Sequence, residues 1–291
     1  MTTHKNGSLT EKTCLVSGSS RGIGYETALG LAGLGAHVIM VSQNQERNQA
    51  AYDRITAEYG QECARYYVAD LTNQAEIRRL AGEIHRDYAA LDVLINNVGG
   101  WYRKFTPSAD GIEMTFALNH LSYWLLTGLL LPLLQKSPSA RIINVSSDAH
   151  FQAKAIQFDD VQFKQHYSPF KVYAHSKLAN VLFTYELSRR LADTDLTVNV
   201  LHPGFVHSEL YRHFGIMTPL VNLLAKTFGK SSVEGAQTSI YLASTQEVSG
   251  ITGQYFSECQ PKKSSLSSYD ESQAKQLWTL SEAMTDFKYD L

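Results

Sequence analysis

The chain has 291 residues, of which 44% are hydrophobic and 19% charged, and its formal net charge at pH 7 is −2. This is the composition of a globular protein with a substantial core, and its charge offers no general attraction to nucleic acid or to an anionic membrane. The three cysteines, Cys14, Cys63 and Cys259, lie far apart without a paired spacing, which predicts reduced thiols in the cytoplasm and no metal site.

No stretch of the sequence predicts a membrane span. Residues 1–12 are polar and lack the apolar centre of a signal peptide, so we expect a frayed leader. The most apolar stretch, 116–134, is interrupted by Asn119 and Ser122 near its start and by Pro132 near its end. It therefore falls short of the roughly 20 apolar residues that a span needs, and we expect a buried helix.

Short β-branched runs alternate with longer helical patterns, which predicts a parallel sheet covered by helices on both faces. The expected strands are 13–17, 37–41, 64–69, 91–96, 141–146, 197–202 and 254–256. The expected helices are 23–34, 46–59, 74–88, 112–135, 172–192, 233–244 and about 271–283. Nothing has the composition of an interdomain linker, so we expect one α/β domain over 1–291, a doubly wound sheet of about seven strands.

Three connections stand out. Loops as long as 148–171 and 204–232 are usually functional or mobile. The second is rich in apolar residues, which predicts a hydrophobic lid over a ligand, although docking on the protein's own core or on a membrane surface is an equal alternative. The serine-rich run 262–268 is interpreted as a solvated turn.

A glycine-rich turn follows the first strand, with the spacing Gly-x-x-x-Gly-x-Gly. Such a turn lets the backbone approach a pyrophosphate, and the helix after it supplies free N–H groups and a positive dipole end. A tight turn without a ligand is the alternative. We expect a dinucleotide to bind at Gly18, Ser20, Arg21, Gly22, Ile23 and Gly24.

The end of the second strand, 40–44, carries no carboxylate. A carboxylate there would bind the 2′-hydroxyl of the adenosine ribose and repel a 2′-phosphate. Arg21 can instead pair with a phosphate, with Ser42 beside it. The pattern favours NADP(H) over NAD(H); a solvated turn position for Arg21 is the alternative.

The third and fourth strands also end in polar residues. Asp70, followed by Leu71, can accept a hydrogen bond from an adenine amino group or belong to the N-cap region of the next helix, and the two roles are compatible. Asn97 can bridge neighbouring strand ends or cap a turn, and Gly99 leaves room for a flat ring.

Tyr173 and Lys177 are four residues apart, so on a helix they share one face. A neighbouring ammonium favours the phenolate and lowers the pKa of a tyrosine. Ser147, at the end of the fifth strand, can hydrogen-bond the same substrate oxygen, and since adjacent strand residues face opposite ways, only one of Ser146 and Ser147 reaches the cleft. The Tyr-x-x-x-Lys spacing alone is common in helices without a catalytic role.

In this order, the motifs resemble the short-chain dehydrogenase/reductase family, which has a Rossmann-like fold, over nearly the whole length. Segments 116–121, 144–150, 177–183, 234–238 and 255–259 are most similar to its retinol-dehydrogenase-like branch. That branch generally acts on lipophilic aldehydes, ketones and alcohols with NADP(H). Its membrane-bound members carry an N-terminal hydrophobic anchor, and we expect none here.

The resemblance implies a catalytic tetrad of Asn119, Ser147, Tyr173 and Lys177. In the direction of reduction, NADPH delivers a hydride to the carbonyl carbon and Tyr173 protonates the developing alkoxide, which Ser147 holds in place. Lys177 would lower the pKa of Tyr173 and bind the nicotinamide ribose. Asn119 would order a water between Lys177 and solvent; a buried amide that kinks a helix is the alternative.

Further contacts are expected around the nicotinamide. The segment after the sixth strand would lie against the carboxamide, or form a simple strand-ending turn; its cofactor residues are Pro203, Gly204 and Val206. The expected substrate contacts are Trp101, Tyr102, Phe205 and Leu210. His150 and Phe151 can add to the aromatic wall or serve the structure.

Three positions depart from the family pattern. Val98 replaces the usual alanine and Ser17 the usual threonine, which are mild changes. Gln43 replaces the arginine common in NADP-using relatives, so the preference for NADP rests on Arg21 and Ser42.

We therefore expect a cytoplasmic NADP(H)-dependent oxidoreductase that interconverts a lipophilic carbonyl compound and its alcohol. The alternative is a regulatory or scaffold protein that binds NAD(P) with little turnover, since a fold does not establish activity. Relatives commonly dimerise through the helices expected at 112–135 and 172–192, which leaves a homo-oligomer open. Nothing in the sequence identifies the substrate or the direction of the reaction.

Overall fold

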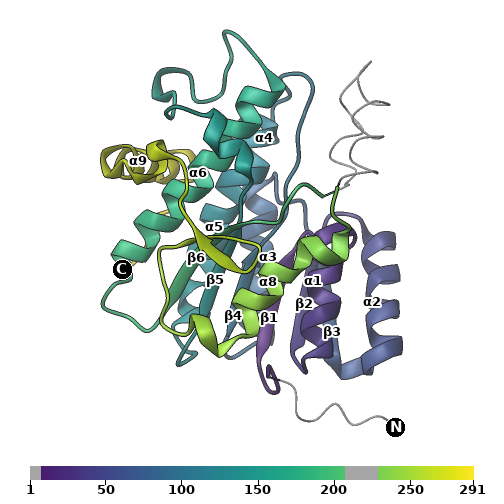
Figure 1. Ribbon diagram of the computed structural model, residues 1–291. Coiled ribbons are helices and arrows are strands. Elements are labelled where there is room, and N and C mark those ends of the chain that lie inside the picture. The colour runs from purple at the N-terminus through teal and green to yellow at the C-terminus, as the bar shows by residue number, and fades with distance from the viewer. Residues whose placement is uncertain (1–7, 207–228) are drawn as a thin grey trace.

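The computed structural model describes residues 8–206 and 229–291. In these residues eight strands form one sheet, in the order β3-β2-β1-β4-β5-β6-β7-β8 (Figure 1). The strands are Thr13–Ser17 (β1), His37–Ser42 (β2), Ala64–Val68 (β3), Val93–Asn96 (β4), Arg141–Val145 (β5), Thr197–His202 (β6), Tyr255–Ser257 (β7) and Gln260–Lys262 (β8). The first seven are parallel and β8 is antiparallel to β7, which confirms the doubly wound α/β sheet.

Helices cover both faces of the sheet. They are Gly22–Gly33 (α1), Gln45–Tyr59 (α2), Gln74–Asp87 (α3), Met114–Phe116 (α4), Ser122–Leu134 (α5), Pro169–Arg190 (α6), Ser232–Ser244 (α8) and Glu271–Thr285 (α9). Alternate strand residues enter two cores: Cys14 and Val16 pack with α1, α2 and α8, whereas Leu15 packs with α3, α5 and α6. Burial on both faces explains why central strands such as β1, β4 and β5 are nearly continuous apolar runs.

The sequence did not predict β8. Its three residues are exposed and include Pro261, so neither hydrophobic alternation nor β-propensity marks it as a strand. It is placed by a tight turn in which Glu258 and Cys259 adopt positive φ angles of 56° and 59°. The pairing with β7 is a tight hairpin, but the composition of β8 does not indicate a strand.

The serine-rich run after β8 is not a solvated turn, and that interpretation is wrong. Ser264, Ser265 and Ser268 are buried. The hydroxyl of Ser264 hydrogen-bonds that of Ser268 at 2.7 Å and that of Tyr185 on α6 at 2.7 Å. The serines are buried because their hydroxyls find partners within the fold.

The long helix expected at 112–135 is divided into three parts. A π-helical turn, Ala117–Leu121, separates α4 from α5. The combined segment Met114–Leu134 has the length and hydropathy of a membrane-spanning helix, but 83% of its most apolar window is buried inside the fold. In this structure it is a core helix, as expected.

The two ends of the described chain are well packed. Residues 1–7 lie outside the described part, but Leu9 is buried and Lys12 pairs with Asp92 at 2.9 Å, so the expected frayed leader is wrong for residues 9–12. At the other end α9 packs along α6. The two ends therefore belong to the fold.

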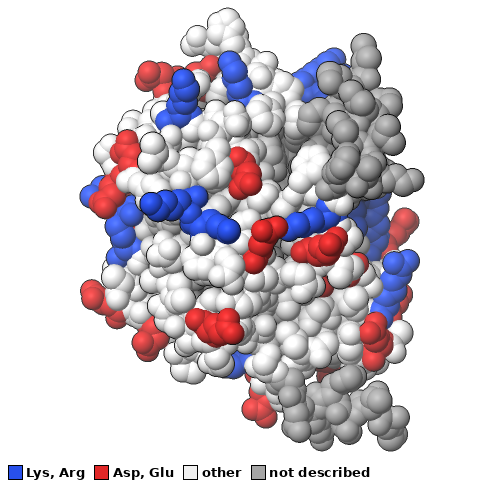
Figure 2. Space-filling view, viewed as in Figure 1, with Lys and Arg blue, Asp and Glu red and all other residues white. Residues whose placement is uncertain are grey.

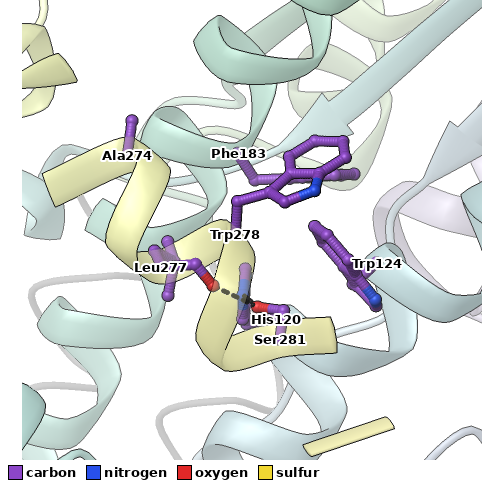
Figure 3. A pocket seen from close by; sticks show the side chains of 7 residues that line it. All are labelled: His120, Trp124, Phe183, Ala274, Leu277, Trp278 and Ser281. Atoms are coloured by element: carbon purple, nitrogen blue, oxygen red, sulfur yellow. Dashed lines mark hydrogen bonds between the residues drawn. The ribbon is translucent and has the colours of Figure 1, made fainter. Parts of the chain in front are cut away.

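The C-terminal segment covers part of the α5–α6 pair, the helices that the resemblance implied for dimerisation. In Figure 3, Trp278 of α9 lies against Trp124 of α5 and Phe183 of α6, and Leu277 lines the same space. The rings of Trp124 and Trp278 meet edge to face at a centroid distance of 4.5 Å. The space between these side chains is too narrow for a water molecule, so this is a packed interface.

On the face shown in Figure 2, acidic and basic side chains are interspersed. This face has no large patch of one sign that would attract a polyanion.

Candidate active site

The strand order reverses between β1 and β4, and in such sheets ligands bind outside the carboxyl ends of the strands at this point. The predicted cofactor and catalytic residues that the structure describes lie at or near these strand ends.

The glycine turn has a shape that only glycines allow. Gly18 and Gly22 have φ angles of +71° and +58°, in the left-handed region. A Cβ on Gly24 would lie 2.2 Å from the carbonyl oxygen of Gly18, so the helix start packs directly on the turn. The helix α1 begins at Gly22 without a side-chain cap, with Arg21 exposed in extended conformation before it. Its first N–H groups are therefore available to an anion, which fits a dinucleotide pyrophosphate.

The ends of β1 and β4 are joined by hydrogen bonds. The Ser17 hydroxyl accepts from the backbone N–H groups of Asn97 and Val98 at 2.9 and 3.1 Å. The Asn97 side chain donates to the Ser17 carbonyl at 2.8 Å. Asn97 thus bridges strand ends, and Ser17 keeps the hydroxyl that this bridge needs.

A ladder of buried amides next to this bridge was not predicted. Asn96 donates to Thr127 of α5 at 2.8 Å and to Asn144 of β5 at 2.9 Å, and Asn144 donates to Thr184 of α6 at 2.9 Å. The signal was present in the sequence, because asparagine in an otherwise apolar strand has to find a buried partner. The ladder fixes β4 and β5 to α5 and to α6, the helix that carries Tyr173 and Lys177.

Asp70 follows β3 and precedes α3. Its carboxylate accepts from the N–H and hydroxyl of Thr72, at 2.9 and 2.8 Å, in a turn. The N-cap of α3 is Asn73, so Asp70 lies in the turn just before the helix and does not cap it directly. Leu71 is buried beside it, and the adenine contact stays a prediction.

The ribose end of the site lies at the carboxyl end of β2. Ser42 is buried, and its hydroxyl donates weakly to the Asn44 carbonyl at 3.4 Å. Asn44 caps α2 through the N–H of Arg47 at 2.8 Å. Arg47 is exposed in the first turn of α2 and was not predicted, because it lies beyond the strand end 40–44 on which the cofactor prediction rests.

Asn119 lies in the π-helical turn and is fully buried. Its side chain exchanges hydrogen bonds with the backbone of Gly100, donating to the carbonyl at 3.0 Å and accepting from the N–H at 2.8 Å. It also donates to the Ser176 hydroxyl at 3.0 Å, and Ser176 donates to the Tyr173 carbonyl at 2.7 Å. The amide therefore connects the β4 loop to the helix that carries Tyr173.

Lys177 is buried, and only 3% of its surface is exposed. Its ammonium donates to the carbonyl of Val145 at 3.1 Å and lies 5.7 Å from the centroid of the Tyr173 ring. Burial lowers the pKa of Lys177 to about 7, because desolvation disfavours the ammonium. Gly99 is exposed, and a Cβ added to it would lie 3.6 Å from this nitrogen. The Lys177 ammonium therefore lies close beneath the surface at Gly99, where the absence of a side chain leaves room for a flat ring.

The two serines after β5 face different ways, as expected. Ser146 is buried and donates to the Lys177 carbonyl at 2.8 Å. Ser147 is partly exposed, and its hydroxyl oxygen accepts from the Ala149 N–H at 3.2 Å. Because a hydroxyl donates one hydrogen and accepts two, Ser147 can still donate to a substrate oxygen.

An aromatic wall borders Tyr173. The Trp101 ring is stacked on the Tyr173 ring at a centroid distance of 5.9 Å and an interplanar angle of 23°. Phe170, which is 44% exposed and was not predicted, lies 6.2 Å from Trp101. Tyr102 instead packs beside Gly100, and its carbonyl accepts from the Tyr167 hydroxyl at 2.8 Å. Trp101 and Phe170 thus lie in one aromatic wall, whereas Tyr102 is turned toward the loop; contact of Trp101 and Tyr102 with a substrate stays a prediction.

After β6, Pro203 and Gly204 are half-buried and Phe205 is 46% exposed. Val206 is buried, and its side chain and that of Ile23 in α1 both pack against Gly235 of α8. The segment therefore closes over the start of α1, as a cofactor-facing turn would.

Several predictions fall on residues that the structure does not describe. Leu210 and most of the lid segment lie in 207–228, outside the described residues. Among the residues that are described, no group of three or more His, Cys, Asp or Glu side chains could hold a metal ion. Phe151 is 47% exposed, while His150 is fully buried and packs within the fold rather than in the aromatic wall.

Comparisons with known proteins place the chain in a family. The sequence profile of the short chain dehydrogenase family matches residues 12–216. Human retinol dehydrogenase 14 is 43% identical over 94% of this chain and 86% of its own length, and human retinol dehydrogenase 12 is 38% identical over 95% and 87%.

Two solved structures have the same fold. A protein from Mycobacterium paratuberculosis described as putative and uncharacterized superposes with a TM-score of 0.80 at 30% identity, covering 100% of this chain and 99% of its own. The NADP active-site complex of Pseudomonas aeruginosa RhlG superposes with a TM-score of 0.69 at 29% identity, covering 85% and 94%. The chain belongs to the short-chain dehydrogenase/reductase family, in its retinol-dehydrogenase-like branch.

Proposed function

We propose that this protein is an NADP(H)-dependent oxidoreductase that interconverts a lipophilic aldehyde or ketone and its alcohol, with Tyr173 as the general acid and base. The proposal rests mainly on the position of the buried Lys177 ammonium, which lies one helical turn from Tyr173. The ring of Tyr173 is in turn stacked on that of Trp101, which is partly exposed. The names of the curated relatives support the substrate class, since retinol is a lipophilic alcohol.

Each catalytic side chain has a role that its contacts support. Tyr173 exchanges a proton with the substrate oxygen, while Ser147 donates a hydrogen bond to the same oxygen. Lys177 holds positive charge beside the phenol, and its pKa near 7 lets it gain or lose a proton at neutral pH. Asn119 keeps the Tyr173 helix in register with the β4 loop through Ser176. A bound nicotinamide supplies or accepts the hydride.

The aromatic wall suits an apolar substrate. Trp101 and Phe170 present ring faces next to Tyr173, so a flat or extended hydrocarbon can pack there while its oxygen reaches the phenol. A polar substrate would gain nothing from this wall. The substrate class therefore follows from the surroundings of the acid.

The preference for NADP(H) over NAD(H) rests on charge. The three residues directly after β2 include no carboxylate, and Arg21 and Arg47 are exposed at the starts of α1 and α2, which flank this end of the strand. Guanidinium groups bind phosphates with two hydrogen bonds, so both are suited to a 2′-phosphate. Glu46 in the first turn of α2 opposes this preference, and a direct binding comparison decides between the two cofactors.

A regulatory NAD(P)-binding protein with little turnover is the alternative function. Such a protein has no need for a buried lysine with a lowered pKa, because a buried charge costs stability. The intact set of Asn119, Ser147, Tyr173 and Lys177 therefore favours the enzyme. The expected cytoplasmic location stays part of the proposal, and cell fractionation tests it.

The experiment is a substrate screen with purified full-length protein. Binding of NADPH and NADH is measured first by nucleotide fluorescence, and a panel of lipophilic carbonyls and alcohols is then tested for turnover. We expect tighter binding of NADPH and turnover of at least one long apolar aldehyde or alcohol. Binding without turnover across the panel would support the regulatory alternative.

A further inference from the structure

The turn that carries Ser147 is held by a histidine that the proposed mechanism does not use. His150 is fully buried at the end of that turn, and its ring contacts two segments that are far apart in the sequence. Its Nδ1 lies 2.7 Å from the carbonyl oxygen of Ser147, and its Nε2 accepts from the backbone N–H of Ser265 at 3.0 Å.

These two contacts define the protonation state of the ring. A backbone N–H can only donate, so Nε2 of His150 carries no proton. A carbonyl oxygen can only accept, so the proton of the neutral ring lies on Nδ1 and is donated to Ser147. Burial keeps the pKa of His150 below its ordinary value, which favours this neutral form at pH 7.

The other side of the turn is held as well. The N–H of Asp148 donates to Nδ1 of His202 at 3.2 Å, and the Asp148 carboxylate accepts from the Tyr255 hydroxyl at 2.6 Å. Nε2 of His202 lies 3.3 Å from the second carboxylate oxygen of Asp148. The backbone on both sides of the Ser147 side chain is thus fixed to β6, to β7 and to the segment after β8.

The Ser147 hydroxyl depends on this turn for its direction. It accepts from the N–H of Ala149, two residues on, and that N–H is in place only while the turn keeps its shape. The Ser147 carbonyl also accepts from the N–H of His150 at 3.0 Å, so the side chain and the backbone of His150 hold the same oxygen. Active-site groups lose much of their effect when they move by about 1 Å, so fixing this turn has a kinetic value.

We infer that His150 is a positioning residue for Ser147: its neutral ring donates from Nδ1 to the Ser147 carbonyl and so directs the Ser147 hydroxyl at the substrate oxygen. The inference rests on the proposed role of Ser147. It also gives a function to the buried serine run, because Ser265 fixes the far side of the ring. The C-terminal part of the chain thereby contributes to the active site without touching substrate.

Two substitutions separate this role from a structural one. In His150→Asn, the side-chain amide takes the place of Nδ1 and keeps the donor to Ser147, but loses the contact with Ser265. In His150→Gln, the amide oxygen takes the place of Nε2 and keeps the contact with Ser265, but loses the donor to Ser147. The pair therefore removes one contact at a time.

The expected result is that His150→Asn keeps kcat within about threefold of the wild type, while His150→Gln lowers kcat by at least about tenfold. The Kd for NADPH is expected to be unchanged in both, because Ser147 contacts the substrate and not the cofactor. Three results would overturn the inference. The opposite order would show that the contact with Ser265 matters instead, an equal loss in both variants would show that the donor to Ser147 has no special effect, and no loss in either would show that neither contact affects turnover.

Hydrogen exchange gives a readout that does not need turnover. We expect the Ala149 amide to exchange faster in His150→Gln than in His150→Asn, because the Ser147 hydroxyl that it binds moves only in the former. Equal exchange in the two variants would overturn the inference. If no substrate is found, the proposed function fails while this measurement still decides the role of His150.

Discussion

The ammonium of Lys177 donates to the carbonyl oxygen of Val145, the last residue of β5, at 3.1 Å. Two residues further along the chain is Ser147, and one helical turn before Lys177 is Tyr173. A single buried contact thus ties the strand that precedes the proposed oxygen-binding serine to the helix that carries the proposed acid.

The buried ammonium of Lys177 is expected to lower the free energy of unfolding of the protein. Its pKa is about 7 in the folded protein and near 10.5 when exposed, so the unfolded chain binds more protons between these pH values. Its cost to stability is therefore full below pH 7, falls as the pH rises from 7 to about 10.5, and vanishes above that. Lys177→Met should raise the unfolding midpoint at pH 6 to 7 and abolish turnover.

Thermal unfolding across this pH range, with and without the substitution, measures the effect. The gain from Lys177→Met should shrink at pH 9 compared with pH 6.5. A variant that is less stable than the wild type at pH 6.5 would show that the ammonium stabilises the fold.

The aromatic wall should govern affinity for apolar substrates. Trp101→Ala and Phe170→Ala each remove a ring beside Tyr173, so KM for a long-chain or polyene substrate should rise about tenfold, while that for a small aldehyde changes little. Tyr52→Ala is the control, since the Tyr52 ring on α2 packs against Tyr66 of the edge strand β3 and not against Tyr173. Equal effects of all three substitutions would argue against a substrate wall at Trp101 and Phe170.

Arg21 should select the cofactor. Arg21→Ala should weaken NADPH binding by about tenfold or more, with NADH binding nearly unchanged, because only NADPH has a 2′-phosphate. Lys275→Ala on α9 removes a positive charge far along the chain and serves as the control. An equal loss for both nucleotides would place Arg21 at the pyrophosphate instead.

The C-terminal residues should matter for stability and not for chemistry. The Tyr289 hydroxyl donates to the Trp124 carbonyl at 2.6 Å, and its ring lies 4.8 Å from that of Trp124. Tyr289→Ala should lower the free energy of unfolding by about 2 kcal/mol and leave kcat unchanged. Lys288→Ala, at an exposed position next to it, should change stability by less than about 0.5 kcal/mol. Denaturant unfolding of both variants measures the difference.

The sequence predicted the parts of the fold whose signals are local. The strands from β1 to β7 are apolar runs, the glycines of the first turn follow a strand, and Tyr173 and Lys177 share a helix face. The parts that were missed lack such a local signal. The strand β8 is a short polar, exposed segment that is defined by its hairpin pairing with the adjacent β7, and the burial of Ser265 depends on His150, 115 residues away.

The same distinction applies within the site. The π-helical turn at Asn119 follows from the two hydrogen bonds that its amide makes with Gly100, which no helical periodicity reveals. Phe170 was overlooked because it lies on the first turn of α6, where the sequence predicted connection. It joins the wall only because Trp101 reaches it from another loop.

The most direct test of the proposed chemistry is turnover by Tyr173→Phe, which keeps the ring beside Trp101 and removes only the hydroxyl. With a confirmed carbonyl substrate and NADPH, we expect kcat to fall by at least about a hundredfold while the Kd for NADPH stays the same. Turnover at the wild-type rate would contradict the assignment of Tyr173 as the proton donor.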